Sequence, residues 1–138
     1  MATFNKFNAF VADLANGVHN LGSNQLVVAL TNTAPSASNA TLSAITEISY
    51  TGLSTRNITT TSSTQTSGTY SLVLVDLTLT ASGAIPTFRY VVIYNDTPTS
   101  PADPLIGYYD YGVGGVTMAN GDTFTIDFTD AQKLIEIV

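Results

Sequence analysis

From residue 25 onward, the chain contains a series of short runs in which apolar side chains recur at every second position. A β-strand with this spacing presents its apolar side chains on one face of a sheet. The runs that follow this period are short and end in turn-forming residues, and they cover residues 26–30, 70–80, 88–94, 105–111, 116–118, 122–128 and 134–138. Short strands at such spacing predict an all-β fold, an antiparallel β-sandwich that is jelly-roll or Greek-key like.

The length of the chain predicts one domain. A chain of 138 residues fits a single core of ordinary size. We expect residues 1–138 to form one β-sandwich domain, in which residues 1–22 are an N-terminal arm or helix and residues 25–138 are the β body.

The first segment has a different period. Its apolar residues recur at three- and four-residue steps and are Phe4, Phe7, Phe10, Val11, Leu14, Val18 and Leu21. This spacing predicts one α-helix with an apolar stripe, begun at Thr3 or Asn5 and ended at Gly17 or Gly22. Two interpretations remain open. The helix packs on the side of the sheet, or its phenylalanines form a partner-binding arm whose removal (residues 1–10) leaves the domain folded.

The run from Tyr70 to Thr80 is apolar on both sides over part of its length. Val73, Val75, Leu77 and Leu79 form one face, and Tyr70, Leu72 and Leu74 lie on the other. An outer strand face that is apolar must be covered. Either the N-terminal helix or a neighbouring subunit is expected to cover it.

Two further segments bear on the topology. Residues 57–69 contain nine hydroxyl side chains and predict an edge strand or a long extended loop. Asn120-Gly121 stands between two alternating runs, and this dipeptide predicts a β-hairpin.

The low charge of the chain limits its partners. Only 10% of residues are charged, and four basic residues oppose ten acidic ones, for a net charge of -6. Direct nucleic-acid binding is not expected, because phosphates require clustered basic residues and these are scattered. The same sign argues against an anionic membrane surface. A weakly charged surface rich in threonine suits burial against a protein partner.

Catalytic residues are scarce in this sequence. Nucleophilic hydrolysis needs a nucleophile, a base and a group that orients the base. There is no cysteine, and the single imidazole, His19, falls at the end of the predicted helix, six residues after Asp13. We therefore expect no enzyme activity and no catalytic residues.

Acidic residues beside aromatic ones leave one alternative open. Tyr108, Tyr109 and Tyr111 surround Asp110, an arrangement that is found in sugar sites, although a strand edge or an interface belt is the favoured interpretation. The pairs Asp96/Asp103 and Asp127/Asp130 resemble calcium ligands only weakly, because no Asp-x-Asp-x-Asp-Gly loop is present. We expect no metal and no cofactor.

Several stretches resemble small proteins encoded among the head genes of tailed bacteriophages. They are residues 1–8 (Met-Ala-Thr-Phe-Asn-Lys-Phe-Asn), 18–21 (Val-His-Asn-Leu), 30–35 (Leu-Thr-Asn-Thr-Ala-Pro), 67–70 (Ser-Gly-Thr-Tyr) and 94–107, from Tyr-Asn-Asp-Thr-Pro to Leu-Ile-Gly. The resemblance spans most of the chain and is weakest over residues 36–66. Proteins of this kind are commonly decoration, or cement, proteins on the outside of the mature capsid.

This resemblance implies a structural virion protein that binds the major capsid protein, as a homo-oligomer or a symmetric array, and that is assembled in the host bacterial cytoplasm. A neck or tail component, and a carbohydrate-binding or adhesin module, remain alternatives. The residues expected to contact a partner are Phe4, Phe7, Phe10, Tyr70, Leu72, Leu74, Tyr108, Tyr109 and Tyr111.

Overall fold

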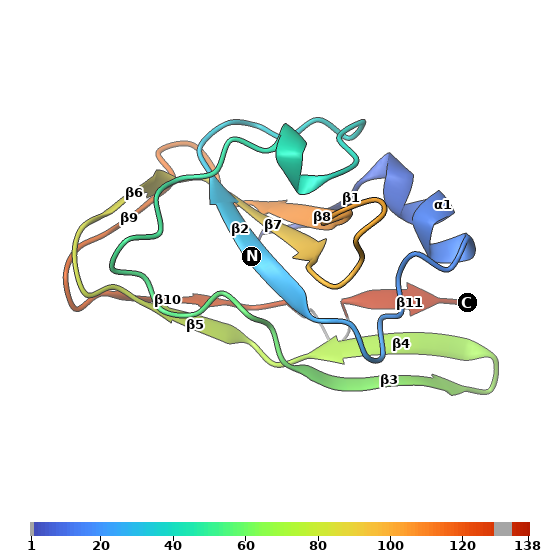
Figure 1. Ribbon diagram of the computed structural model, residues 1–138. Helices are drawn as coiled ribbons and strands as arrows, with labels where there is room; N and C mark the ends of the chain where they lie inside the picture. The colour runs from blue at the N-terminus through green and yellow to red at the C-terminus, as the bar shows by residue number, and fades with distance from the viewer. Residues whose placement is uncertain (1, 129–133) are drawn as a thin grey trace.

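The computed structural model describes residues 2–128 and 134–138 (Figure 1). Its elements, in chain order, are β1 (Phe4–Lys6), α1 (Asn8–Ala15), β2 (Leu26–Thr31), the 3₁₀ turn η1 (Leu42–Ala44), β3 (Thr60–Thr66), β4 (Thr69–Leu74), β5 (Leu77–Thr80), β6 (Ile85–Phe88), β7 (Tyr90–Asn95), β8 (Leu105–Asp110), β9 (Val116–Met118), β10 (Thr123–Ile126) and β11 (Ile135–Ile137).

Most of the body is one long antiparallel ribbon. Its first arm runs from β4 to β7 and its second arm from β8 to β11. In it β4 pairs with β11, β5 with β10, β6 with β9, and β7 with β8. Residues 96–104 join the two arms at the tip. A long hairpin folded over on itself is the construction principle of jelly-roll sandwiches.

The ribbon is interrupted where its arms differ in length. Leu72 and Leu77 are five positions apart, whereas their partners Ile135 and Ile126 are nine apart. Phe88 and Tyr90 are two positions apart, whereas their partners Val116 and Asp110 are six apart. The unequal lengths break the ladder at both places, as bulges do on a smaller scale.

Folding of the ribbon produces two layers (Figure 1). The sheet β1-β8-β7-β2 lies over the sheet β11-β4-β3 and the pair β5-β10, and all pairings are antiparallel. The main core lies between the layers and includes Val28, Leu30, Leu72, Leu79, Phe88, Ile93, Ile106 and Ile126, each fully buried. The antiparallel β-sandwich with one N-terminal helix is thus confirmed.

A second, smaller core covers the outer face of β2, β7 and β8. It contains Phe7, Val27, Ala29, Val92, Tyr94 and Leu105, with Leu42 and Ile45 packed against them. Leu42 belongs to η1 and Ile45 follows it, so the segment after β2 returns across this face. Every residue of β2 and β7 is therefore buried, which explains why both strands are apolar without a clear alternation.

The predicted extent of the helix was wrong. Phe4 to Lys6 form β1, which pairs with β8 in the register Phe4 opposite Tyr109. The helix α1 then has only eight residues, and its N-cap, Phe7, makes no side-chain capping hydrogen bond. An edge position beside β8 satisfies the backbone of β1, so the three-residue spacing of the phenylalanines spans a strand and a helix rather than one helix.

Two strand predictions also need correction. The run 70–80 is not one strand, because it breaks at Val75-Asp76, where Val75 is 49% exposed. Asn120-Gly121 does not close a hairpin, since β9 pairs with β6 and β10 pairs with β5. The tight hairpin lies instead at Ser67-Gly68, with φ of 51° and 85°, the positive pair that a type I′ turn requires.

Residues 57–69 contribute β3, which is an edge strand, as one of the two interpretations predicted. Among the helices that the structure describes, none is long and apolar enough to cross a membrane.

Candidate interaction surface

The N-terminal phenylalanines pack inside the chain rather than on its surface. Phe7 is fully buried and lies 5.3 Å from the Tyr108 ring, centroid to centroid, and Phe10 is buried against His19 at 5.2 Å. Phe4 is half-buried and lies 5.4 Å from Tyr109. Of the two interpretations, packing on the sheet accounts for these rings, and deletion of residues 1–10 would remove part of the core.

Tyr70, Leu72 and Leu74 are covered by the chain itself. Leu72 and Leu74 are buried in the main core together with Phe10 and Leu21. Tyr70, at the end of this row, is half-buried, and its hydroxyl lies 2.8 Å from that of Ser63. The helix and the loop after it therefore supply the cover that the apolar strand face needs.

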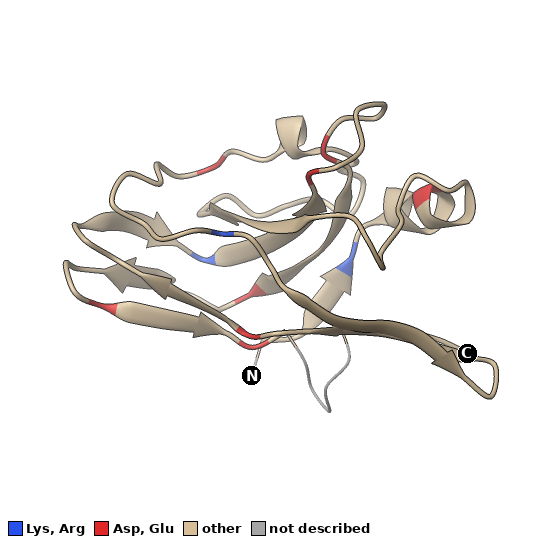
Figure 2. Cartoon of the chain, turned by 60° about the horizontal axis from the view of Figure 1, so that its bottom comes forward, with Lys and Arg blue, Asp and Glu red and all other residues tan. Residues whose placement is uncertain are grey.

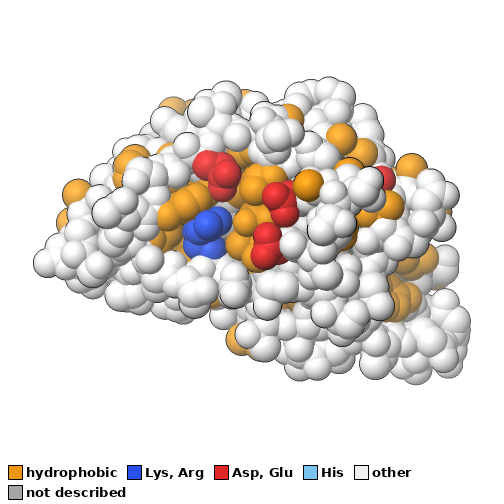
Figure 3. All heavy atoms as spheres, viewed as in Figure 1, with side chains coloured by type: hydrophobic (Ala, Val, Ile, Leu, Met, Phe, Trp, Pro, Cys, Tyr) orange, Lys and Arg blue, Asp and Glu red, His pale blue; other side chains and the backbone are white. Residues whose placement is uncertain are grey.

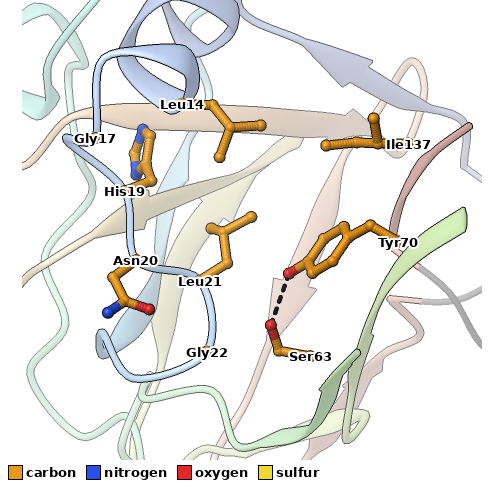
Figure 4. A pocket seen from close by; sticks show the side chains of 9 residues that line it. All are labelled: Leu14, Gly17, His19, Asn20, Leu21, Gly22, Ser63, Tyr70 and Ile137. Carbon is orange, nitrogen blue, oxygen red and sulfur yellow. Dashed lines mark hydrogen bonds between the residues drawn. The ribbon is translucent and has the colours of Figure 1, made fainter. Parts of the chain in front are cut away.

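An open groove of about 630 Å³ remains between that loop and the β3-β4 hairpin (Figure 4). Its apolar lining comes from Leu14, Leu21 and Ile137, and its polar lining includes His19, Asn20, Ser63 and Tyr70. The Tyr70 and Ser63 hydroxyls bond to each other at one end of this groove, opposite His19 (Figure 4).

His19 is held by a network of amides. The Asn95 Nδ2 group donates to His19 Nδ1 over 3.1 Å and to Asn24 Oδ1 over 2.8 Å, while Asn95 Oδ1 accepts from the Thr97 N–H. Because an amide NH₂ only donates, Nδ1 must be an acceptor and the proton of the neutral ring lies on Nε2. Nε2 is buried without a hydrogen-bond partner among the described residues.

Burial also sets the charge of this histidine. His19 is 6% exposed, and burial lowers its pKa below 6.5, with nearby Asp13 opposing the shift. The neutral ring is hydrogen-bonded to Asn95 and packs on Phe10, so it connects the N-terminal loop to β7.

The tyrosines around Asp110 do not form a common platform. Successive residues of β8 point to opposite faces of the sheet. Tyr108 packs on Phe7 in the outer core, whereas Tyr109 is buried in the main core, where its hydroxyl donates to the Phe128 carbonyl over 2.8 Å. Tyr111 packs edge-on against Phe124 at 5.1 Å, and burial raises its pKa to about 12.

Asp110 is engaged in a bidentate ion pair. Arg89 Nε and Nη2 donate to its two oxygens over 2.7 and 2.9 Å, and the Gly112 N–H donates to Oδ1 over 2.8 Å. The hydrogen bonds from Arg89 lower the pKa of Asp110 most, followed by the one from Gly112. This carboxylate fastens the 111–115 connection to the sheet.

A second charged cluster lies on the face seen in Figure 3, where charged side chains surround an apolar floor. Arg56 Nη1 donates to the Val28 carbonyl, the guanidinium stacks 3.6 Å from the centroid of the Tyr50 ring, and Glu47 lies 4.0 Å away. The Tyr50 hydroxyl donates to Glu47 and accepts from the Leu30 N–H. These contacts fix the segment between η1 and β3 to β2.

The structure bears differently on the two pairs of acidic residues that weakly resemble calcium ligands. Burial raises the pKa of Asp103, and the neighbouring Asp96 raises it further, so the first pair does come together. In the second pair, Asp130 lies outside the described residues. No group of three His, Cys, Asp or Glu residues that could hold a metal ion exists within residues 2–128 and 134–138.

The β3-β4 hairpin is the part of the surface that sequence reasoning missed. Residues 57–75, between Arg56 and Asp76, contain no charged side chain, and the cartoon shows this ribbon free of acidic and basic residues (Figure 2). Val73 and Val75 lie on its outward side, opposite to Leu72 and Leu74, and Val75 is exposed. The absence of charge over this run is visible in the sequence and was the available signal.

Comparison with known proteins gives no relative for this chain. No protein-family model matches it, and neither a curated protein nor a solved structure is significantly similar to it.

Proposed function

We propose that this chain is a non-catalytic structural protein of a tailed-bacteriophage virion, a decoration protein that binds the outside of the capsid and stabilises it. The resemblance of residues 1–8, 30–35 and 94–107 to small phage head proteins supports this proposal. The major capsid protein is the proposed partner.

The observation that carries the proposal is the uncharged β3-β4 hairpin. A surface made of hydroxyls and the exposed Val75 loses little hydration when another protein covers it, and charged residues are depleted at the centre of protein interfaces. The charged side chains of Arg56, Glu47, Arg89 and Asp110 are engaged within the fold. The hairpin therefore offers a surface that is easily desolvated.

A decoration protein gains from repetition. Each contact buries a modest apolar area, worth on the order of 25 cal/mol per Å². Many copies on one shell add such contacts together, and linked copies bind more tightly than single ones. A rigid sandwich with one uncharged outward surface suits this role.

The carbohydrate-binding alternative has lost the observation that motivated it. It required Tyr108, Tyr109 and Tyr111 as an aromatic platform beside a free Asp110. Tyr109 is buried, Tyr108 and Tyr111 pack into different cores, and Asp110 is paired with Arg89. We therefore do not propose it.

Two measurements test the proposal. Mass spectrometry of purified virions of the phage that encodes the chain should detect it in many copies, and its absence would refute the virion assignment.

In co-sedimentation with particles stripped of the protein, Val75→Lys should reduce binding about tenfold or more, because a charge then enters the interface. Val113→Lys is the matched control, since Val113 is 94% exposed and lies in the connection between β8 and β9 rather than in the hairpin. Equal binding of both variants would remove the hairpin from the contact.

A further inference from the structure

We propose that two copies of this chain pair antiparallel along the open edge of β3, so that the sheet β11-β4-β3 of one copy continues into that of the other. The proposal deepens the structural role argued above by naming a second partner at the same hairpin. Capsid binding is assigned to the outward face of β4, and self-pairing to the edge of β3.

The edge of β3 lacks the features that protect other edges. Sheet edges are usually blunted by charged residues, by proline or by shortness, since their free N–H and C=O groups otherwise recruit another strand. The edge strand β1 has three residues and carries Lys6, and β11 has three residues and carries Glu136. The edge strand β2 is also uncharged, but the backbone of residues 48, 56 and 58 bonds to its edge. By contrast, β3 has seven residues, none of them charged and none of them proline, and its one register shift, between Thr60 and Ser62, lies outside residues 63–65.

The hairpin turn determines which groups of β3 are free. The residues that flank a two-residue turn form a hydrogen-bonded pair, and hydrogen-bonded and non-bonded pairs then alternate along the ladder. Thr66 opposite Thr69 and Thr64 opposite Ser71 are thus bonded within the hairpin. Ser63 and Gln65 direct their N–H and C=O groups to the open edge, where no backbone hydrogen bond from the rest of the described chain reaches them.

This alternation fixes the register of a symmetric pair. If a two-fold axis passes beside Thr64, Ser63 of each copy faces Gln65 of the other, and the two residues exchange N–H···O=C bonds. The two Thr64 residues then form a non-bonded antiparallel pair across the axis. The contact uses the same surface on both copies, so it closes at two chains.

Charge favours a second copy as the occupant. Each molecule carries a net charge of -6, so most surfaces of two copies repel each other. Residues 57–75 carry no charged side chain, so two copies can meet along this stretch without repulsion. A strongly charged partner would find no opposite charge on this edge. A strand identical to β3 is complementary to it in both hydrogen bonding and charge.

The absence of cysteine gives a direct test on purified full-length protein, without capsids. Thr64→Cys should form a disulfide-linked dimer under mild oxidation, because Cα atoms of a non-bonded antiparallel pair lie about 4.5 Å apart, within disulfide range. Thr66→Cys is the matched control on the same strand and the same face. In the proposed register residue 66 faces residue 62 of the other copy, so Thr66→Cys should remain monomeric on a non-reducing gel.

Sedimentation velocity supplies the second arm of the test. The unmodified protein should sediment as a dimer at about 100 µM, and Thr64→Lys should raise its dissociation constant at least about tenfold by placing like charges across the axis. Circular dichroism checks that this exposed substitution leaves the fold intact. A wild-type monomer at that concentration, or equal cross-linking of both cysteine variants, would overturn the pairing. Neither result bears on detection of the chain in virions, so the two proposals fail separately.

Discussion

At the scale of single residues, His19 belongs to a residue type that is common in catalytic sites, yet here it contributes to packing. Its Nδ1 accepts from Asn95, its ring packs on Phe10, and its Nε2–H is buried with no partner among the residues that the structure describes. The folded chain therefore disfavours a second proton on this ring, which is the physical reason for the lowered pKa.

This arrangement predicts a pH dependence of stability. Because the pKa of His19 is lower in the folded chain than its ordinary 6.5, the unfolded chain binds more protons below that pH. The free energy of unfolding should therefore be fully retained above pH 6.5 and should fall as the pH drops below it, by at most about 1.4 kcal/mol per pH unit for one proton.

Urea unfolding between pH 7.5 and 5 measures this slope, and His19→Asn is the control. The Asn oxygen can take the place of Nδ1 as acceptor, while every carboxylate of the chain is kept. The difference between the two proteins isolates the histidine. Identical slopes would show that His19 does not titrate differently in the folded state.

Residue types alone did not reveal where the phenylalanines point. Phe4, Phe7 and Phe10 fit a helical stripe, yet Phe4 packs in the main core and Phe7 in the outer core, on opposite sides of one sheet. The deciding partner is β8, about a hundred positions later in the chain. No local pattern contains that information.

At the scale of elements, the docking of β1 on β8 depends on Gly107. A Cβ atom at this position would overlap the ring of Phe4 and would lie 2.8 Å from the Asn5 carbonyl oxygen. The backbone of Gly107 does not need a positive φ, so the requirement is one of space.

We expect Gly107→Ala to displace β1 and to lower the free energy of unfolding by about 1–3 kcal/mol, the range for an overpacked site. Hydrogen exchange should accelerate at the Phe7 amide, which donates to the Ile106 carbonyl over 3.1 Å. Gly83→Ala is the matched control, because a Cβ there meets nothing within 4 Å. Unchanged exchange at Phe7 would show that β1 tolerates the added methyl group.

Strands that are recognised by their buried apolar residues were predicted well. Turns and breaks that depend on which strands pair were predicted poorly. The strands around Val28, Val92, Ile106 and Phe124 were all expected from their apolar runs. The two turns were not distinguished, because Asn120-Gly121 and Ser67-Gly68 both permit a positive φ. The strand pairing distinguishes them. Asn120-Gly121 joins β9 and β10, which pair with β6 and β5 and not with each other, whereas Ser67-Gly68 joins β3 and β4, which do pair.

At the scale of the whole molecule, the alternation of residues 25–138 was enough to predict an antiparallel sandwich. It did not predict the outer core, to which Leu42 contributes although residues 36–44 have the composition of a surface loop. The interaction surface was out of reach for a similar reason. Tyr70 and Leu72 were expected to meet a partner, whereas the exposed groups of that hairpin are the uncharged edge and Val75.

The long ribbon sets the order in which the chain can fold. Tyr94 and Leu105 pair across only 11 positions, whereas Tyr70 and Ile137 pair across 67. Closing a short loop costs less entropy, so β7-β8 should form before β4-β11. In stopped-flow refolding, Ile93→Val should slow folding, and Leu72→Ala should mainly speed unfolding. The opposite assignment would place the nucleus at the ends of the ribbon.

If the ribbon closes from its tip, the strands that support the β3-β4 hairpin are the last to be secured. The two-residue turn lets β3 and β4 pair early, but until β11 joins them they form an isolated two-stranded ribbon, which is only marginally stable in water. In the proposed pairing, a lasting β3 edge, and with it the recruitment of a second copy, therefore follows completion of the core.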